Sequence, residues 1–355
     1  MIRVGVIGYG YWGPVVARNF QAAEGCQLSM VCDKNPAALE RAAKAFPGIQ
    51  VTTDPSEVVR SPQIDAVAVI TPVWTHFEFA KAALENGKHV FVEKPFTASA
   101  SEASELIDLA LARKLQIMVD HTFLFTGAVR KIRQLIDEGA LGKLFYYDSS
   151  RVNLGLFQHD VNVIWDLAPH DLAIMDHLID GQPEAVSATG QCHLNGLEDL
   201  AYITIYYQKM LAHINVNWLS PVKVRTTLIG GEKKMVVWND MEADEKVKVY
   251  DKGVEITHSQ GVYDLLVSYR SGDMWAPKVD QTEALKLEAK YFVECIEKNE
   301  TPFNDGVAGL RVVRLLEAAA QSLKEIIFRR TSFSPCPALE ACEDMTKPAR
   351  PFALR

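Results

Sequence analysis

The spacing of apolar residues divides the chain into two regions. Over residues 1–120, short runs rich in β-branched residues alternate with stretches that carry Ala, Leu, Glu and Lys at helical spacing. The runs predict strands at 2–7, 28–32, 65–70, 88–92 and 115–119, and the stretches predict helices at 14–23, 36–46, 75–86 and 99–113. Strands that alternate with helices are typical of βαβ units, so this region predicts a doubly wound parallel sheet.

After about residue 120 the pattern changes to a period of two. Residues 202–207 and 212–218 alternate apolar and polar side chains, as strands with two different faces do. Further strand-like runs lie at 144–152, 184–192, 224–229, 234–238 and 246–250, and they predict a large mixed sheet. Two helices are expected after the sheet, one with Leu285, Ala289, Phe292 and Ile296 on one face, and one with Leu310, Val313, Leu316, Ala320, Leu323 and Ile327. Asp305 is the expected N-cap of the second helix.

The length of 355 residues is that of two domains. The change of pattern places a dinucleotide-binding domain at 1–120 and a second α/β domain at 121–330. Residues 331–355 hold four prolines and no sustained periodicity, so we expect an extended tail there.

Composition excludes several classes of protein. The net charge of -8 is modest and spread along the chain, which argues against a nucleic-acid partner. A strand is predicted from residue 2, no apolar run approaches the ~20 residues of a membrane helix, and we expect a cytoplasmic protein without a membrane partner. The six cysteines show no C-x-x-C spacing and are expected to be reduced thiols: Cys26, Cys32, Cys192, Cys295, Cys336 and Cys342.

A glycine motif follows the first predicted strand. Gly8-Tyr9-Gly10-Tyr11-Trp12-Gly13 matches G-x-G-x-x-G and opens a predicted helix, which is the context of a dinucleotide site. Gly8 permits the turn, Gly10 lets a pyrophosphate approach, and Gly13 allows the helix to pack closely. Asp33 ends the second strand, where an acid binds the adenosine ribose and favours NAD, while neighbouring Lys34 leaves NADP open. Tyr11 and Trp12 are expected to line the cofactor.

Two further motifs stand in a set order along the chain. Thr71-Pro72-x-x-x-His76 follows the strand at 65–70, and Gly87-Lys88-His89-Val90 leads to Glu93-Lys94-Pro95. Later comes Trp165-Asp166-Leu167-Ala168-Pro169-His170-Asp171, and then Gly309-Leu310-Arg311-Val312-Val313. In these motifs the chain resembles the Gfo/Idh/MocA family of sugar and inositol oxidoreductases over roughly residues 1–330.

The resemblance implies a fold and an assembly. It implies a Rossmann domain followed by an α/β domain with an open, mostly antiparallel sheet that carries the substrate site. That sheet is also expected to join copies of the chain into a homodimer or homotetramer. It implies no metal, and we find no metalloenzyme spacing that includes Asp166, His170 and Asp171 with His159 or His177.

The resemblance singles out three catalytic candidates. To oxidise a secondary alcohol, a base removes the hydroxyl proton, and the ordinary pKa of His170 near 6.5 suits that task. Asp166 lies one helical turn earlier and either orients the imidazole or binds substrate. Lys94 stabilises the developing alkoxide or relays the proton, and its division of labour with His170 stays open. Taken singly, the three also fit a surface lysine, a helix N-cap and a core histidine.

The nicotinamide end of the cofactor is expected at the loops that follow the predicted strands at 65–70 and 88–92. Thr71, Pro72, His76, Glu93 and Lys94 are expected to border the cofactor there, with His76 packing beneath it. In similar proteins the peptide before Pro95 is often cis.

Polar side chains gather before Trp165 and indicate a polyhydroxylated substrate. His121, Arg151, Asn153, Asn162 and Trp165 are the substrate candidates, alongside Gln158, His159 and Asp160, although a solvated loop has the same composition. Arg151 suits a carboxylate or phosphate, which admits nucleotide sugars.

The sequence therefore predicts an NAD-dependent oxidoreductase that acts on a sugar, nucleotide sugar or cyclitol. Two alternatives remain. One is a glycosidase or lyase that uses NAD transiently. The other is a non-catalytic nicotinamide sensor, whose expected mark would be the loss of Lys94 or His170, and both are present.

Overall fold

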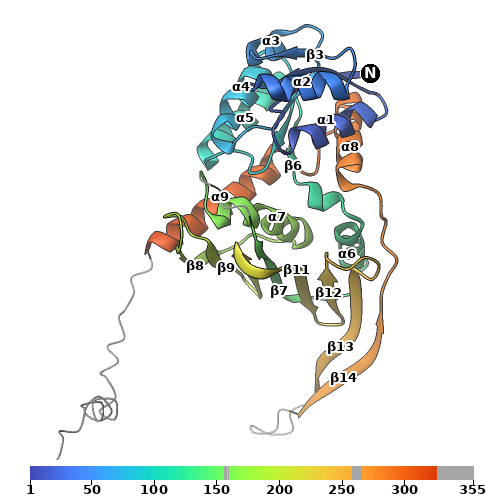
Figure 1. Ribbon diagram of the computed structural model, residues 1–355. Coiled ribbons are helices and arrows are strands. Elements are labelled where there is room, and N and C mark those ends of the chain that lie inside the picture. Colours follow the sequence, from blue (N-terminus) through green and yellow to red (C-terminus); the bar gives the residue numbers. More distant parts are fainter. Residues whose placement is uncertain (156–157, 159, 258–265, 326–355) are drawn as a thin grey trace, which may run out of the picture. The chain divides into compact units, whose positions relative to one another are not determined.

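The computed structural model describes residues 1–155, 158, 160–257 and 266–325 (Figure 1). The predicted tail at 331–355 lies outside the described residues. So do Ile327, Cys336, Cys342 and His159.

The N-terminal region folds around a six-stranded parallel sheet, as the alternation of strands and helices predicts. The strand order is β3-β2-β1-β4-β5-β6, and each neighbouring pair is parallel. The strands are β1 (Ile2–Ile7), β2 (Cys26–Cys32), β3 (Gln50–Thr52), β4 (Ala66–Val69), β5 (His89–Glu93) and β6 (Ile117–Asp120). The helices are α1 (Gly13–Ala22), α2 (Pro36–Ala45), α3 (Pro55–Arg60), α4 (His76–Glu85) and α5 (Ala100–Arg113), with a 3₁₀ turn η1 (Val73–Thr75) before α4.

The sequence pattern misses β3 and α3. The strand is three residues long, lies at the sheet edge and is largely exposed, so it carries no apolar run. The helix is six residues long, too short for a helical period to show. Strand order reverses between β1 and β4, and open α/β sheets bind ligands at the carboxyl ends of strands at such a point.

The second region contains an eight-stranded sheet. Its order is β14-β13-β12-β11-β7-β10-β9-β8, and only β7 and β10 run parallel among the described pairs. The strands are β7 (Leu144–Leu154), β8 (Ala185–Gln191), β9 (Leu200–Tyr207), β10 (Met210–Asn217), β11 (Leu219–Gly231), β12 (Met235–Asn239), β13 (Val247–Thr257) and β14 (Leu266–Trp275). The mostly antiparallel open sheet implied by the resemblance is confirmed.

Helices complete this region. They are η2 (Thr122–Phe125), α6 (Gly127–Asp137), α7 (Val163–Leu178), α8 (Ala284–Lys298) and α9 (Gly306–Glu325). Strand β14 and helix α6 were not predicted. Strand β14 contains a polar stretch and pairs only with β13 at the sheet edge, so its pattern is weak.

Helices α8 and α9 return to the N-terminal sheet (Figure 1). Leu285, Ala289 and Phe292 of α8 belong to one buried apolar cluster with residues of β1, α1 and β2. The Phe292 ring lies 5.7 Å from that of Phe91 on β5. Helix α9 begins behind its predicted N-cap, since Asp305 Oδ1 accepts a hydrogen bond from Ala308 N at 2.9 Å.

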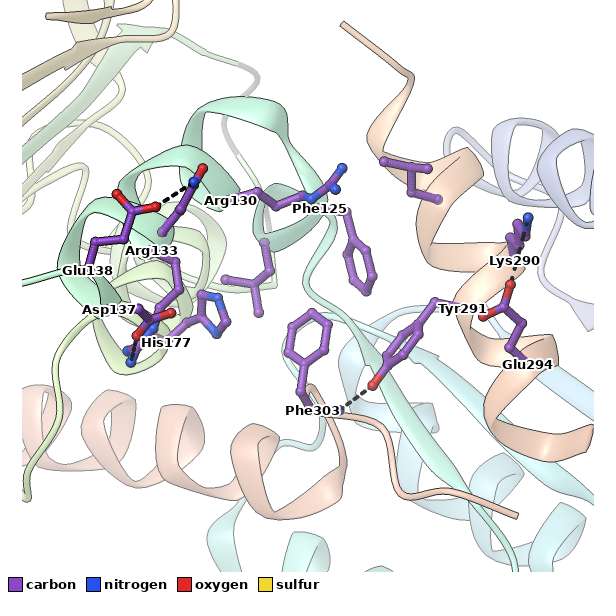
Figure 2. A pocket seen from close by; sticks show the side chains of 13 residues that line it. Phe125, Arg130, Arg133, Asp137, Glu138, His177, Lys290, Tyr291, Glu294 and Phe303 are labelled. Atoms are coloured by element: carbon purple, nitrogen blue, oxygen red, sulfur yellow. Dashed lines mark hydrogen bonds and ion pairs between the residues drawn. The ribbon is translucent and has the colours of Figure 1, made fainter. Parts of the chain in front are cut away.

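Helices α6 and α8 flank a surface cavity of about 720 Å³ (Figure 2). Its wall includes the tilted rings of Phe125, Tyr291 and Phe303. Two ion pairs at its wall lie within single helices, Arg133 with Asp137 on α6 and Lys290 with Glu294 on α8, while Arg130 pairs with Asp280. No predicted site residue lines this cavity.

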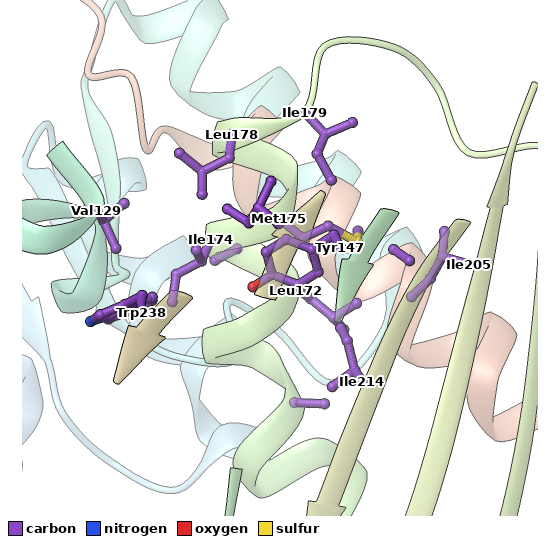
Figure 3. Close-up of a cluster of buried hydrophobic side chains, with 14 of the residues drawn as sticks. Val129, Tyr147, Leu172, Ile174, Met175, Leu178, Ile179, Ile205, Ile214 and Trp238 are labelled. Atoms are coloured by element: carbon purple, nitrogen blue, oxygen red, sulfur yellow. The ribbon is translucent and has the colours of Figure 1, made fainter. Parts of the chain in front are cut away.

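One face of the eight-stranded sheet is buried beneath α7. Leu172 and Met175 of the helix pack among Tyr147 of β7, Ile205 of β9 and Trp238 of β12 in one cluster (Figure 3). Alternate residues on the strands point away from this core and remain exposed, which leaves one apolar face of the sheet outside it.

A carboxylic acid interrupts the apolar face of α8. Glu288 is fully buried, and its Oε1 accepts a hydrogen bond from Asn304 Nδ2 at 3.1 Å. Its Oε2 has no hydrogen-bond partner among the described residues, and Asp120 and Thr122 are the polar groups that act on this carboxyl group. On the other side, Glu93 pairs with Asp120 in the register of β5 and β6. Three acids therefore meet at the end of β6.

The acids cannot all be ionised at neutral pH. Burial, and next the charge of Asp120, raise the pKa of Glu288 and of Glu93 well above the ordinary range. We infer that Glu288 carries a proton on Oε2, because Oε1 is already an acceptor. Its contribution to stability is present at low pH and is lost as the pH rises through its raised pKa.

We expect Glu288→Gln to become more stable relative to the wild type as the pH rises from 5 to 8. The amide oxygen keeps the bond from Asn304, and the amide nitrogen supplies a permanent donor toward Asp120. The difference in unfolding free energy should grow by roughly 1 kcal/mol or more, since a proton held only by the folded state is worth about 1.4 kcal/mol per pH unit between the unfolded and folded pKa values. Urea unfolding at several pH values measures it.

Glu294→Gln on the same helix is the matched control. That carboxylate forms surface pairs with Lys290 and Lys298, and we expect no growing difference with pH. If the two variants show the same pH dependence, Glu288 is not protonated in the folded protein.

Candidate active site

The loops at the carboxyl ends of β1, β4, β5 and β6 meet at one edge of the N-terminal sheet. The glycine motif follows β1, and two of its glycines are required by close contacts. Gly8 has φ +101°, and a Cβ there would lie 2.2 Å from the carbonyl oxygen of Ile70. A Cβ at Gly13 would lie 2.3 Å from the carbonyl oxygen of Gly8. Around Gly10 no atom lies within 4 Å of such a position. The loop is therefore tight at both ends and open at its centre, as a pyrophosphate requires.

Asp33 holds this loop in place. Its Oδ2 accepts a hydrogen bond from Tyr9 N at 2.6 Å, and its Oδ1 accepts one from Asn35 N at 2.8 Å. A carboxylate has about four lone-pair sites, so acceptor capacity remains for ribose hydroxyls. Lys34 beside it is exposed.

The two aromatic residues of the glycine motif differ in placement. Tyr11 is 91% exposed. Trp12 turns inward instead, and its Nε1 donates to Asp120 Oδ2 at 2.8 Å. Trp12 thus links the glycine loop to the acidic cluster at the end of β6.

His76 joins the loops that follow β4 and β5. The side chain is fully buried, with Nε2 2.7 Å from Thr71 O and Nδ1 2.9 Å from Pro95 O. Burial is the main cause that lowers its pKa. The Lys94–Pro95 peptide is cis, as the resemblance predicts. His76 therefore positions Thr71, Pro72 and Lys94 without facing solvent.

Lys94 reaches from the first domain to the start of α7. Its Nζ donates to Asp166 O at 2.8 Å and lies 3.6 Å from Asp166 Oδ1. The other carboxylate oxygen accepts a hydrogen bond from Trp218 Nε1 at 3.0 Å. The side chains of Lys94 and Asp166 are only 15% and 20% exposed. The sequence predicts Lys94 and Asp166 in one site, and the structure places them in contact. It gives no sign that Trp218 belongs to this site, because the neighbours of Trp218 depend on sheet register.

His170 lies one turn beyond Asp166 on α7. Its Nδ1 is buried without a hydrogen-bond partner among the described residues, and its ring contacts Phe123 edge-on at 5.0 Å between centroids. Burial, and then the charges of Lys94, Arg151 and Arg225, hold its pKa well below 6.5. The imidazole is therefore neutral at pH 7 and able to accept a proton.

The predicted substrate residues separate into two groups. His121 and Arg151 are buried near His170, and burial lowers the pKa of His121 to about 3. Asn162 is instead the N-cap of α7, where its oxygen accepts from Trp165 N at 3.1 Å and its nitrogen donates to Glu198 at 2.8 Å. Both polar groups of Asn162 thus have structural partners.

Asn153 and Trp165 occupy the borders of the region. Asn153 lies near the end of β7, partly buried, with its side chain beside Gly155. Trp165 is partly buried and packs against core residues of both regions.

The described residues contain neither a candidate metal site nor a helix that could span a membrane. Within the described ranges, no group of three or more His, Cys, Asp or Glu side chains is arranged to hold a metal ion. In the same part of the chain, no helix is both long and apolar enough to cross a membrane.

Comparisons with known proteins agree with this architecture. Residues 2–121 match the oxidoreductase family with an NAD-binding Rossmann fold, and residues 129–237 match the GFO/IDH/MocA C-terminal domain. UDP-N-acetylglucosamine 3-dehydrogenase of Acidithiobacillus ferrooxidans is 29% identical over 324 residues, which cover 88% of this chain and 94% of that protein. The scyllo-inositol 2-dehydrogenase (NADP(+)) of Bacillus subtilis is 25% identical, with 91% and 94% covered.

Solved structures extend the likeness to the whole fold. A crystal structure of the Acidithiobacillus ferrooxidans enzyme superimposes with a TM-score of 0.77 at 25% identity, covering 91% of this chain and 97% of that one. The two matched regions of the sequence and the fold with its two sheets thus indicate the same family. The chain belongs to the Gfo/Idh/MocA family of NAD(P)-dependent oxidoreductases.

Proposed function

We propose that this chain transfers a hydride between a secondary alcohol of a sugar, nucleotide sugar or cyclitol and the nicotinamide of NAD. The observation that carries the proposal is the contact between Lys94 of the cofactor domain and Asp166 of α7, beside a neutral His170. It supports a division in which residues 1–120 bind the cofactor and 121–330 present the substrate. The relatives described above are named for a nucleotide sugar and for a cyclitol.

His170, Lys94 and Asp166 each have a separate role in alcohol oxidation. NAD supplies the hydride acceptor when it is bound. The hydroxyl group must also lose its proton, and the free lone pair of neutral His170 can take it. The ammonium of Lys94 stabilises the negative charge that develops on the oxygen, while Asp166, to which Trp218 donates a hydrogen bond, holds that ammonium in place. A final relay of the proton through Lys94 remains compatible with this arrangement.

Cofactor preference follows from Asp33. A carboxylate at this position repels a 2′-phosphate, which supports NAD as the preferred cofactor. Relatives from Bacillus subtilis are named for NAD(+) and for NADP(+), so the family does not decide the matter. The free thiols of Cys26, Cys32, Cys192 and Cys295 support a cytoplasmic location.

The exposed face of the second sheet supports self-association. Tyr206, Leu211 and Tyr146 lie side by side on β9, β10 and β7, and are 44%, 44% and 37% exposed. We infer that this row contacts a second copy of the chain, because a contiguous apolar patch on a sheet favours burial.

Lys94→Ala is expected to lower turnover by about a hundredfold or more while NADH binding persists, because general acid-base and charge-stabilising groups contribute on this order. The assay follows nicotinamide absorbance with free aldoses, inositols and nucleotide sugars, and fluorescence titration reports NADH binding.

Lys81→Ala is the control, since that lysine pairs with Glu105 on the surface of the same domain. Full activity of the Lys94 variant would refute the catalytic assignment. Absence of turnover by the wild type on every alcohol would refute the proposed function.

Leu211→Glu should shift the oligomer toward monomer in sedimentation experiments. A charge in the row with Tyr146 and Tyr206 would be buried unpaired in the interface. Leu111→Glu on α5, which is 71% exposed, provides the control. An unchanged molar mass for Leu211→Glu would show that this face is not the interface.

A further inference from the structure

Two arginines lie directly opposite each other on neighbouring strands of the second sheet. In the antiparallel register of β11 and β7, Arg225 pairs with Arg151, and Thr227 pairs with Ser149. Directly opposed residues point to the same face of a sheet, and like charges in such a pair destabilise it. The fold therefore accepts a cost to place two guanidinium groups together.

Both guanidinium groups lie against one aromatic ring beside the catalytic histidine. The Cζ atoms of Arg151 and Arg225 are 4.5 Å and 5.4 Å from the ring centroid of Phe123. The same ring contacts His170 at 5.0 Å. The positive charge is thus located next to the group that accepts the substrate's proton.

Arg151 is only partly satisfied by its carboxylate partner. Its Nε and Nη2 donate to Asp171 at 2.5 Å and 3.3 Å. Its Nη1 is buried and has no hydrogen-bond partner in the part of the chain that the structure describes. Arg151 itself is 4% exposed, so this unpartnered nitrogen is not satisfied by bulk water.

Arg225 shares its carboxylate with another cation. Its Nη1 lies 3.5 Å from Asp240 Oδ2, while Lys246 Nζ lies 3.2 Å from Asp240 Oδ1. Burial, followed by the charge of Arg151, lowers the pKa of Arg225. Among the described residues, the two carboxylates of Asp171 and Asp240 therefore face three cations, which leaves an excess of one positive charge, and the side chain of Arg225 is 33% exposed.

We propose that the substrate is an acidic sugar, whose carboxylate is bound by Arg225 and Arg151 while its hydroxyl group faces His170 and Lys94. The proposal rests on the proposed function and narrows its substrate class. A single excess charge matches a carboxylate, and the planar guanidinium donors match its two oxygens. Because both arginines contact the ring that contacts His170, the carboxylate and the reacting hydroxyl belong to one sugar unit.

Binding of a carboxylate has a further effect on the base. Lys94, Arg151, Arg225 and His121 all act to lower the pKa of His170. An anion between the arginines opposes their effect, so His170 becomes a stronger base when the substrate is bound.

The test compares hexuronates with their uncharged amides. Glucuronate, galacturonate and mannuronate, each beside its uronamide, are titrated into the full-length protein saturated with NADH, and binding is measured by calorimetry. We expect at least one uronate to bind about tenfold or more tighter than its amide, because a charge-assisted hydrogen bond is worth roughly that factor or more. Arg225→Met should remove most of this preference, because the uronate loses a charged partner and its binding weakens more than that of the amide.

Two variants control for fold and charge. Arg130→Met removes an arginine that pairs with Asp280 at the surface of α6, and it should retain the wild-type preference. Arg225→Lys keeps the charge and should restore part of the preference. If Arg225→Met fails to bind NADH, the wild-type ratio of uronate to amide still tests the proposal.

The outcomes separate this inference from the proposed function. Equal binding of all uronates and their amides overturns the acidic sugar, even if neutral sugars are oxidised. Tighter binding of UDP-glucose than of every uronate overturns the carboxylate in favour of a phosphate. Nicotinamide reduction failing with every alcohol refutes the proposed function, while an Arg225-dependent preference for a uronate still supports an acidic ligand.

Discussion

The contact between Lys94 and the first turn of α7 is the interaction on which the site depends. A lysine at the end of a parallel strand donates to the carbonyl oxygen of Asp166 and lies beside its carboxylate. Neither region alone contains both partners. His76 fixes the lysine loop from one side, Trp218 fixes Asp166 from the other, and their geometry follows from two separate hydrophobic cores that happen to meet here.

The electrostatics on the two sides of this contact are opposite. Near Lys94, the carboxyl groups of Glu93 on β5, Asp120 on β6 and Glu288 on α8 lie too close together to be ionised at the same time. On the side of the second sheet, the guanidinium groups of Arg151 on β7 and Arg225 on β11 act on His170, which stays neutral. Desolvation drives both effects, because burial removes the water that would otherwise stabilise each charge. The site thus has a neutral base at its centre and fixed charge around it.

Residues close in sequence were predicted well, and residues that meet through sheet register were not. The glycine motif, Asp33, Lys94 and the Asp166–His170 spacing each depend on a few consecutive positions, and periodicity places their elements. Arg225 meets Arg151 only through the pairing of β11 with β7, which no local pattern specifies. Trp218 was missed for the same reason. Glu288 did carry a signal, since a charged residue on the apolar face of a helix indicates a buried polar group. Asn162 was predicted as a substrate residue, and the structure shows that it also caps a helix, a role that a polar residue before a helix commonly has.

The return of α8 and α9 to the first domain limits how this protein can be taken apart. Helix α9 contributes Leu310 and Val313 to the N-terminal core, and Val312, Leu315 and Leu316 to the other. The hydrophobic core around the N-terminal sheet is therefore built from discontinuous parts of the chain, although the motifs predicted to bind the cofactor all lie before residue 121. Grafting a different nucleotide preference onto this scaffold by exchanging residues 1–121 would leave α8 and α9 packed against foreign side chains. A chimaera has to carry the two helices with the sheet they cover.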